Sequence, residues 1–118
     1  MERFQHVLII DDDPITSSII LNLLKEKVTR IDAISDGNLA TEKIKHGKYD
    51  LVFLDLHLPG KSGMEILDEI RDMPMLPRIV GISSTKERGK QTLFENRGLH
   101  HLLSKPLYSK EIFEAIQS

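Results

Sequence analysis

Runs of consecutive apolar residues alternate with longer amphipathic segments along the whole chain. The strongest runs span residues 7–10, 51–54 and 79–82. Short apolar runs of this kind are typical of strands that are covered on both faces. Weaker candidates lie at residues 28–34 and 101–104, and the gap between the first two strong runs leaves room for one more strand. We therefore expect five strands.

The segment after the first run has the pattern of an amphipathic helix. Asp13 is placed to cap its N-terminus, and Pro14 occupies the first helical position, where a missing N–H has no consequence. Apolar residues then recur at the spacing of one helical face. They are Ile15, Ile19, Ile20, Leu23 and Leu24. This segment is predicted to be the first helix.

Turn and capping residues mark the second and third helices. Asp36 and Gly37 form a turn ahead of the second helix. Ser62 and Glu65 have the spacing of a capping box ahead of the third, in which each side chain bonds the other residue's backbone N–H. The apolar positions that follow are Leu39, Ala40 and Ile44 in the second helix and Met64, Leu67 and Ile70 in the third.

The last two helices are predicted to differ in stability. The segment 84–96 begins with a capping-box spacing at Ser84 and Glu87, but it carries Gly89 and has no apolar residue in its first half. We expect it to be the loosest helix, because it has little to bury. Ser109 is placed to cap the final helix. That helix would bury Ile112, Phe113 and Ile116.

Strands that alternate with helices predict an α/β fold. Neighbouring parallel strands need a crossover connection, so the helices would wrap both faces of one parallel sheet. A chain of 118 residues is long enough to bury one core and too short for two. No Pro-rich or Gly/Ser-rich linker divides the sequence. We expect a single domain over residues 1–118.

Composition and charge argue against several classes of protein. The 16 Lys and Arg residues nearly balance the 18 Asp and Glu residues, and a net charge of −2 gives no field that would attract nucleic acid. Cysteine is absent, which removes disulfides and thiolate metal sites. No apolar stretch approaches the roughly 18 residues needed to span a bilayer. We expect a cytoplasmic protein without direct contact to nucleic acid or membrane.

Polar side chains follow the predicted strands at the edge of the sheet where ligand sites form. Each one has an ordinary explanation as a turn or capping residue. Because the carboxyl ends of parallel strands meet on one rim, however, these side chains would all gather there. The residues are Asp11 and Asp12 after the first strand, Asp55 after the third, Ser83 and Ser84 after the fourth, and Lys105 after the fifth.

The charges of this rim predict a cation site. Asp11, Asp12 and Asp55 carry three negative charges against the single positive charge of Lys105. Carboxylates held close together raise one another's pKa or recruit a cation, and an oxygen-only site with few carboxylates suits Mg²⁺. A carboxylate beside Mg²⁺, an ammonium and the Ser83 hydroxyl has the parts needed to accept a phosphoryl group. Asp55 would be the nucleophile.

Four segments resemble the receiver domain of two-component response regulators. They are VLIIDDDP at 7–14, YDLVFLDLHLPGKSG at 49–63, RIVGISS at 78–84 and LLSKPL at 102–107. Each is only moderately specific, but together they cover nearly the whole chain in the family's order. The resemblance implies a three-layer, doubly wound (βα)5 fold of the flavodoxin-like or CheY-like type, with five parallel strands in the order 2-1-3-4-5.

The resemblance also assigns roles to the rim residues. Asp55 would be the phosphate acceptor, and it would hold Mg²⁺ together with the backbone carbonyl of His57. Ser83 would bond a phosphoryl oxygen and Lys105 would pair with it. Asp11 and Asp12 would be the remaining metal ligands, with Asp12 the more direct one.

Further implications concern the backbone and the partners. The family commonly has a cis peptide at the position of Lys105–Pro106. The protein would not be a conventional enzyme but would catalyse its own phosphorylation and dephosphorylation. Its donor would be a histidine kinase or histidine phosphotransfer protein that docks near the first helix, where Ile15 and Ser18 would be exposed. Its output partner would read the helix 84–96, the strand 101–104 and the C-terminal helix.

Some residues depart from the family pattern or invite another interpretation. Leu102 stands where the family usually has Tyr or Phe, which leaves an aromatic switch in doubt, and Ser84 adds a hydroxyl where Ala or Gly is common. His57 is placed to overhang the phosphoryl group and affect its lifetime, although a solvated surface histidine explains it equally well. His100 and His101 would point to opposite sides of a strand, which argues against a metal site there.

Two other functions fit parts of the sequence. Asp11 and Asp13 imitate the nucleophile motif of haloacid-dehalogenase-like phosphatases, but Ile15 falls where that family expects Thr or Val, and no acidic pair follows Lys105. A degenerate receiver that binds a partner without phosphorylation would not need the complete set of rim residues. Whether the chain is a stand-alone receiver or a piece of a longer regulator or hybrid kinase stays open.

Overall fold

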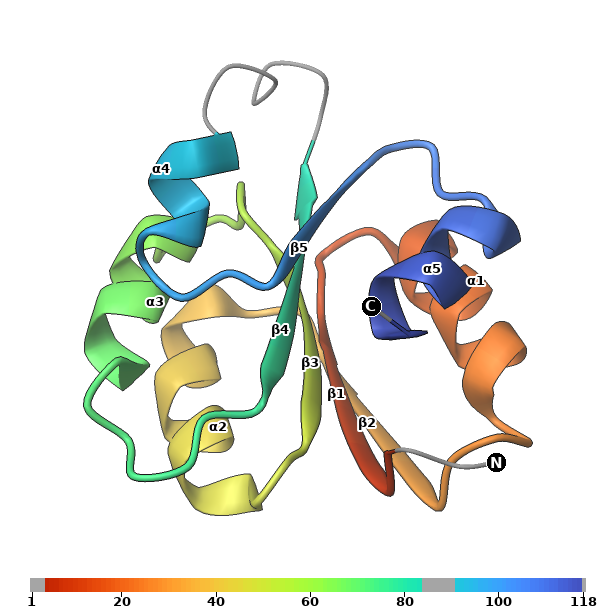
Figure 1. Ribbon diagram of the computed structural model, residues 1–118, viewed down its shortest axis with the longest axis horizontal. Helices are drawn as coiled ribbons and strands as arrows, with labels where there is room; N and C mark the ends of the chain where they lie inside the picture. Colours follow the sequence, from red (N-terminus) through yellow and green to blue (C-terminus); the bar gives the residue numbers. More distant parts are fainter. Residues whose placement is uncertain (1–3, 84–90, 118) are drawn as a thin grey trace.

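Five parallel strands form one sheet at the centre of the molecule (Figure 1). The computed structural model describes residues 4–83 and 91–117. The strand order is β2-β1-β3-β4-β5, which confirms the fold class expected from the sequence. The strands are β1 (His6–Ile10), β2 (Arg30–Ile34), β3 (Leu51–Asp55), β4 (Arg78–Ser83) and β5 (His101–Ser104).

Helices cover both faces of this sheet, which gives three layers (Figure 1). Helices α1 and α5 lie on one face, and α2, α3 and α4 lie on the other. The bounds are α1 (Pro14–Leu24), η1 (Gly37–Leu39, a 3-10 turn), α2 (Ala40–Gly47), α3 (Gly63–Ile70), α4 (Gln91–Glu95) and α5 (Ser109–Gln117). No helix among the described residues is long and apolar enough to cross a membrane.

Each interior strand contributes to two separate hydrophobic cores. In β1, Leu8 and Ile10 join the core on the α2 and α3 side, whereas Val7 and Ile9 join the core on the α1 and α5 side. All four side chains are fully buried. Successive residues of a strand point to opposite faces, so a continuous apolar run is what a strand covered on both sides requires.

The two weak strand candidates are the two edges of the sheet. Within the part of the chain that the structure describes, β2 pairs only with β1, and β5 pairs only with β4. Most of their residues are half-buried or exposed, in contrast to the wholly buried β3. An edge strand has one open side, which explains why these two sequences are more polar than the interior ones.

Most predicted helix starts are confirmed. The Asp13 carboxylate accepts a hydrogen bond from the Ile15 N–H, and the capping box between Ser62 and Glu65 is formed. At the last helix the prediction is shifted by one position. Ser109 is already the first helical residue of α5. The carbonyl of the preceding residue, Tyr108, accepts hydrogen bonds from the Glu111 and Ile112 N–H groups.

Two expectations about helix faces need comment. Ile15 was grouped with the apolar face of α1 but is 70% exposed, because it lies in the first turn, beyond the cover of the core. The other expectation for Ile15, exposure beside the site, is confirmed. In the fourth helix, α4 occupies residues 91–95 and buries Phe94. The predicted cap at Ser84 and Glu87 lies outside the described residues.

Candidate functional site

Three carboxylates meet at the carboxyl end of the sheet. Asp55 is the last residue of β3, and Asp11 and Asp12 directly follow β1. One ligand oxygen from each of the three residues lies within 4.8 Å of the others. Asp11 and Asp55 are buried, at 3% and 4% exposure, while Asp12 is exposed. The strand ends thus gather the acidic side chains as the sequence predicts.

Lys105 brings the positive charge to this cluster from the end of β5. Its Nζ lies 3.4 Å from Asp11 Oδ2, 3.6 Å from Asp55 Oδ2 and 4.0 Å from Asp13 Oδ2. Its backbone N–H donates to the Ser83 carbonyl at 2.8 Å, and the peptide bond from Lys105 to Pro106 is cis, as expected. Burial lowers the pKa of Lys105, but the Asp11 and Asp55 carboxylates outweigh this effect and raise it overall.

Asp11 has a buried carboxylate oxygen that lacks a hydrogen bond. Its Oδ1 accepts a hydrogen bond from the Asp13 N–H at 2.8 Å, whereas its buried Oδ2 has no hydrogen-bond partner among the described residues. Burial, with a further contribution from the Asp55 carboxylate, raises the pKa of Asp11 to about 6. A buried oxygen without a hydrogen bond, beside two further carboxylates and with only the Lys105 ammonium 3.4 Å away, fits a hard divalent cation such as Mg²⁺.

The segment after β3, residues 56–62, follows the predicted phosphate acceptor Asp55 and is named the acceptor loop for this reason. It starts with a backbone bond from the Leu56 N–H to the Ile82 carbonyl at 2.9 Å. The His57 N–H then donates to Asp55 Oδ1 at 2.9 Å, which fixes one oxygen of the Asp55 carboxylate. The other oxygen, Oδ2, faces Lys105. The two Asp55 oxygens therefore have different surroundings: Oδ1 is hydrogen-bonded to the backbone, and Oδ2 faces the Lys105 ammonium.

Ser83 ends β4 beside the acceptor strand. The register pairs Asp55 with Ile82, so Ser83 lies one residue further along the same rim. It is 1% exposed. Ser84, the extra hydroxyl of the sequence, lies outside the described residues.

The residues that depart from the family pattern have ordinary surroundings. Leu102 is half-buried and packs against the core on the α3 side. His100 Nδ1 accepts a hydrogen bond from the Ile79 N–H at 3.0 Å. Among the described residues, Asp11, Asp12 and Asp55 form the only cluster of three potential metal-ligating side chains, and the two adjacent histidines are not part of it.

A contact that the sequence reasoning missed lies beside the acceptor loop. The turn η1, predicted only as the start of a helix, packs against the loop through Gly37 and Asn38. Gly37 is buried. Its burial depends on residues more than twenty positions away, so no local pattern in the sequence would have identified it.

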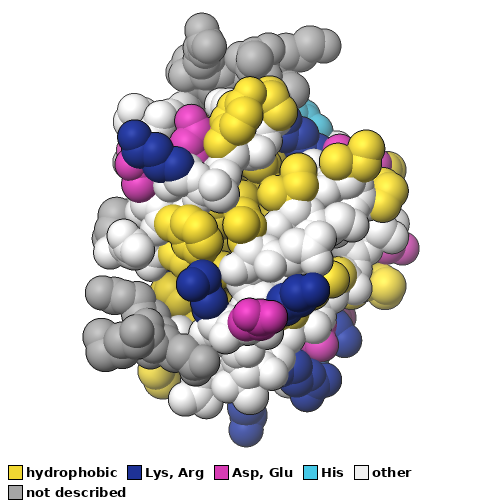
Figure 2. All heavy atoms as spheres, turned by 90° about the vertical axis from the view of Figure 1, so that its right-hand side faces the viewer, with side chains coloured by type: hydrophobic (Ala, Val, Ile, Leu, Met, Phe, Trp, Pro, Cys, Tyr) yellow, Lys and Arg dark blue, Asp and Glu magenta, His cyan; other side chains and the backbone are white. Residues whose placement is uncertain are grey.

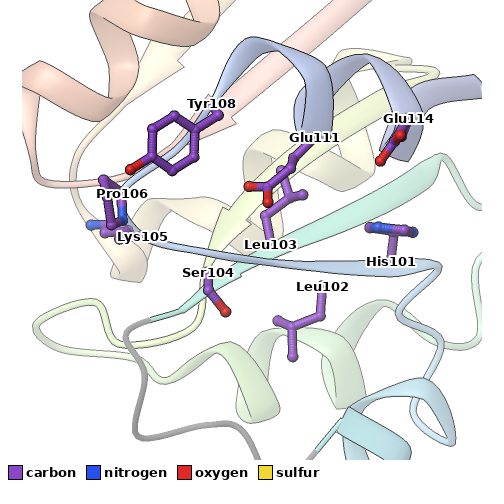
Figure 3. A pocket seen from close by; sticks show the side chains of 9 residues that line it. All are labelled: His101, Leu102, Leu103, Ser104, Lys105, Pro106, Tyr108, Glu111 and Glu114. Atoms are coloured by element: carbon purple, nitrogen blue, oxygen red, sulfur yellow. The ribbon is translucent and has the colours of Figure 1, made fainter.

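Two clefts border the site. One, of about 350 Å³, opens between the start of α1 and the end of β2 and includes Asp11 and Asp12. The other, of about 520 Å³, runs along the outer edge of β5 beneath α5 (Figure 3). Its lining is His101, Leu102, Leu103, Ser104, Lys105, Pro106, Tyr108, Glu111 and Glu114.

A doubly wound sheet with an acidic, lysine-bearing rim defines the class of receiver domains. In agreement with this, residues 7–117 match the response regulator receiver domain family, and the chain belongs to that family.

Matches are found both to a protein of similar length and to one segment of a much longer protein. The two-component response regulator ARR22 of Arabidopsis thaliana is 29% identical over 118 residues, which cover 98% of this chain and 83% of that protein. The aerobic respiration control sensor protein ArcB of Escherichia coli is 32% identical over 105 residues, which cover 86% of this chain but only 13% of ArcB.

A solved structure shows the same fold. It is the receiver domain of the sensor histidine kinase PA1611 from Pseudomonas aeruginosa, described with a magnesium ion coordinated in its active site cleft. The TM-score is 0.82 at 23% identity, over 98% of this chain and 96% of that one.

Proposed function

We propose that the protein is a phosphorylation-controlled switch that takes a phosphoryl group from a phosphohistidine onto Asp55 in a magnesium-dependent reaction. The observation that carries this proposal is the position of Asp55. It is a buried carboxylate with one oxygen bonded to the backbone and the other 3.6 Å from the Lys105 ammonium. Asp11 and Asp12, which would hold the cation, lie directly beside it.

The proposed transfer needs no further catalytic group from the chain. The free Asp55 oxygen forms a bond to phosphorus while the bond between phosphorus and the donor nitrogen breaks, and the imidazole leaves with the electron pair. Lys105 would stabilise the negative charge of the phosphoryl oxygens, and the Ser83 hydroxyl would donate to one of them. Hydrolysis of the acyl phosphate by water would restore the carboxylate, so the chain would not be a conventional enzyme.

Asp11, Asp12, Asp55 and the carbonyl of His57 are the proposed ligands of Mg²⁺. The Asp11 oxygen that has no hydrogen bond and the excess of carboxylates over cations support a cation here. When bound, the ion would neutralise charge on the phosphoryl group. The magnesium in the active site cleft of the PA1611 receiver domain also supports this assignment.

The donor would dock on the face that α1 and α5 present. Figure 2 shows this face, and hydrophobic side chains gather in its centre. Ile15 beside the site is 70% exposed, and Leu21 and Tyr108 are exposed as well. An exposed apolar surface next to the acceptor is suited to a histidine kinase or histidine phosphotransfer protein.

The output partner would read the surface built by α4, β5 and α5. The cleft along β5 belongs to this surface, and Glu111 and Glu114 of α5 point into it (Figure 3). Phosphorylation adds roughly −1.5 to −2 charges at the rim, which would draw Ser83 and Lys105 inward at the ends of β4 and β5. Leu102 lies on β5 itself, so it would move with this strand although it has no aromatic ring.

The competing functions are weaker. Membership in the receiver family argues against the phosphatase hypothesis. In addition, Asp11, the nucleophile that hypothesis requires, has one oxygen bonded to the Asp13 N–H and the other buried. The degenerate receiver has no support from the site, because the acidic cluster and Lys105 are both in place. Absence of nucleic-acid contact and a cytoplasmic location remain predictions.

The test is the intact mass of the protein after incubation with phosphoramidate, a small donor with a bond between phosphorus and nitrogen. We expect a gain of one phosphoryl group that depends on Mg²⁺ and is lost in Asp55→Asn. Asp72→Asn, which changes an exposed aspartate outside the site, is the matched control and should gain the group like the wild type. A wild type that stays unmodified would refute the proposal.

A further inference from the structure

Two residues of the turn η1 contact four consecutive residues of the acceptor loop. A Cβ built on Gly37 would lie 2.8 Å from the Lys61 carbonyl oxygen and 3.3 Å from both the Leu58 Cβ and the Pro59 carbonyl oxygen. One built on Gly60 would lie 2.8 Å from the Asn38 amide nitrogen. The turn and residues 58–61 therefore pack together, with no room for a methyl group at Gly37 against the backbone of the loop, whereas at Gly60 the neighbour is the end of the Asn38 side chain.

The turn that makes these contacts is itself held firmly. The Asp36 carboxylate accepts from the Asn38 N–H at 2.9 Å, and the Asp36 carbonyl accepts from the Leu39 N–H at 3.1 Å. The Ala40 N–H then donates to the Gly37 carbonyl, which continues the turn into α2. Because α2 is anchored in the core by Ala40 and Ile44, the turn cannot easily retreat from the loop.

Side chains add a second connection between the same two segments. The Lys61 ammonium of the loop lies 2.8 Å from Glu69 Oε1 on α3, and the Thr41 hydroxyl of α2 donates to the same oxygen. Glu69 thus joins α2 to the loop. The contacts with the loop therefore come both from the turn, at Gly37 and Asn38, and from the first residues of α2, at Thr41 through Glu69.

The position of His57 makes this packing relevant to the metal. His57 lies between Asp55, which is fixed in β3, and the packed residues 58–61. Its carbonyl is the only proposed ligand on the loop. Mg²⁺ requires nearly octahedral geometry with oxygens at about 2.0–2.1 Å, so a shift of a few tenths of an ångström in one ligand weakens binding.

We propose that Gly37 and Asn38 are positioning residues that hold the acceptor loop where the His57 carbonyl can complete the magnesium site, an inference that rests on the proposed function. Neither residue would touch the metal or the phosphoryl group. The requirement at position 37 is for space, because the backbone there is not in the left-handed region that favours glycine.

The test is calorimetric titration of the folded protein with MgCl2. We expect Gly37→Ala to weaken magnesium binding about tenfold, the scale seen when a residue that orients a metal ligand is changed. Asn38→Ala, at an exposed position, should fold normally and weaken binding by a smaller factor, because it loosens only the contact with Gly60.

The matched control is Gly47→Ala at the far end of the sheet. A Cβ there would come within 2.1 Å of the Tyr49 ring, so this variant also crowds a packed glycine, but away from the loop. Its affinity for Mg²⁺ should equal that of the wild type, even if thermal melts show that it is less stable. Tyr49→Phe is a milder control at the same end.

The outcomes separate the two proposals. If the wild type does not bind Mg²⁺, the proposed function fails and this inference fails with it. If the wild type binds Mg²⁺, and both Gly37→Ala and Asn38→Ala bind it with the same affinity as the wild type, the inference alone is overturned. A loss as large in Gly47→Ala as in Gly37→Ala would also overturn it, because the effect would then reflect general instability. Should Gly37→Ala fail to fold, Asn38→Ala decides.

Discussion

Two aspartates of the sheet, the buried Asp11 and the half-buried Asp32, have their pKa values shifted in opposite directions. At the carboxyl rim, burial raises the pKa of Asp11 to about 6, and one of its oxygens lacks a hydrogen-bond partner. In β2, hydrogen bonds from Tyr49 and His6 outweigh desolvation and lower the pKa of Asp32 to about 2. One carboxylate oxygen of Asp11 thus has no hydrogen bond, whereas both carboxylate oxygens of Asp32 are hydrogen-bonded.

The hydrogen bonds of Asp32 connect the edge strand β2 to residues at the starts of two interior strands, β1 and β3. Asp32 Oδ2 lies 2.6 Å from the Tyr49 hydroxyl and 3.0 Å from His6 Nε2, and Oδ1 lies 3.3 Å from Arg30 Nε. The rings of His6 and Tyr49 are 4.1 Å apart. This cluster ties the edge strand β2 to β1 and to the start of β3. An aspartate whose oxygens are hydrogen-bonded within the protein stabilises the fold, whereas an aspartate with an oxygen that lacks a hydrogen bond can bind a ligand.

The largest difference between the two aspartates should appear in metal binding. Asp11→Asn removes a charge and a proposed ligand from the rim, and we expect it to weaken Mg²⁺ binding by at least about 100-fold, the upper end of the range for residues that only orient a metal ligand. Asp32→Asn should leave the affinity unchanged, because Asp32 lies in the middle of the edge strand β2 and its carboxylate is bonded to His6 and Tyr49 instead of facing the rim. Titration calorimetry of both variants checks this, and equal losses would abolish the distinction.

Stability without metal should respond in the opposite sense. Asp32→Asn disrupts a network of charge-assisted hydrogen bonds and should lower the free energy of unfolding by about 2 kcal/mol. Tyr49→Phe, which removes a single bond, should cost about 1 kcal/mol. Asp11→Asn should raise stability by about 1 kcal/mol, because it relieves a buried charge that is partly screened by solvent. Urea denaturation measures all three, and a destabilised Asp11→Asn would contradict the account.

The pH dependence should also differ between the two aspartates. The pKa of Asp11 is higher in the folded protein than its ordinary value of 3.8, so the folded state binds more protons between about pH 4 and 6, and this contribution to stability declines as pH rises through that window. Asp32 has a lowered pKa, so its contribution is complete above about pH 4 and is lost as pH falls towards 2.

Urea denaturation at a series of pH values, without Mg²⁺, separates these contributions. His100 must be allowed for, since burial and the Arg78 charge lower its pKa and its contribution is lost as pH falls below 6.5. The difference between wild type and Asp11→Asn isolates the rim, because His100 is common to both. A difference that does not change between pH 4 and 6 would show that Asp11 is not perturbed.

The smallest effect is expected at His57. Its side chain is exposed and follows the acceptor by two residues. If it overhangs the phosphoryl group, His57→Ala should speed hydrolysis of the acyl phosphate a few-fold by admitting water, with no change in stability. Loss of radiolabel from the purified phosphoprotein gives the rate. His46→Ala, at another exposed histidine, serves as control, and an unchanged rate in His57→Ala would remove the hypothesis.

The sequence predicts those parts of the fold that follow from local pattern or from parallel strand geometry. β1, β3 and β4 are continuous apolar runs because they are buried on both faces, and the rim residues follow from where these strands end. The edge strands β2 and β5 are only weakly indicated, since each has an open side. The helical pattern wrongly places Ile15 on the buried face, because periodicity predicts the face on which a residue lies but not how far the core extends along the helix.

Contacts between distant polar or small residues could not be predicted. Asp32 and His6 are polar residues within strands, and nothing in their sequence neighbourhood shows that they meet Tyr49. Gly37 reads as an ordinary turn residue, and its close packing on the acceptor loop depends on how two segments far apart in the sequence come together. Such contacts depend on tertiary structure.

The most direct test of the account is to locate the phosphoryl group. After treatment with phosphoramidate and Mg²⁺, reduction with borohydride converts an acyl phosphate to the corresponding alcohol, and peptide mass spectrometry identifies the altered residue. The account predicts homoserine at position 55, at no other aspartate, and none without Mg²⁺. Modification at Asp11 instead, or no modification at all, would contradict it.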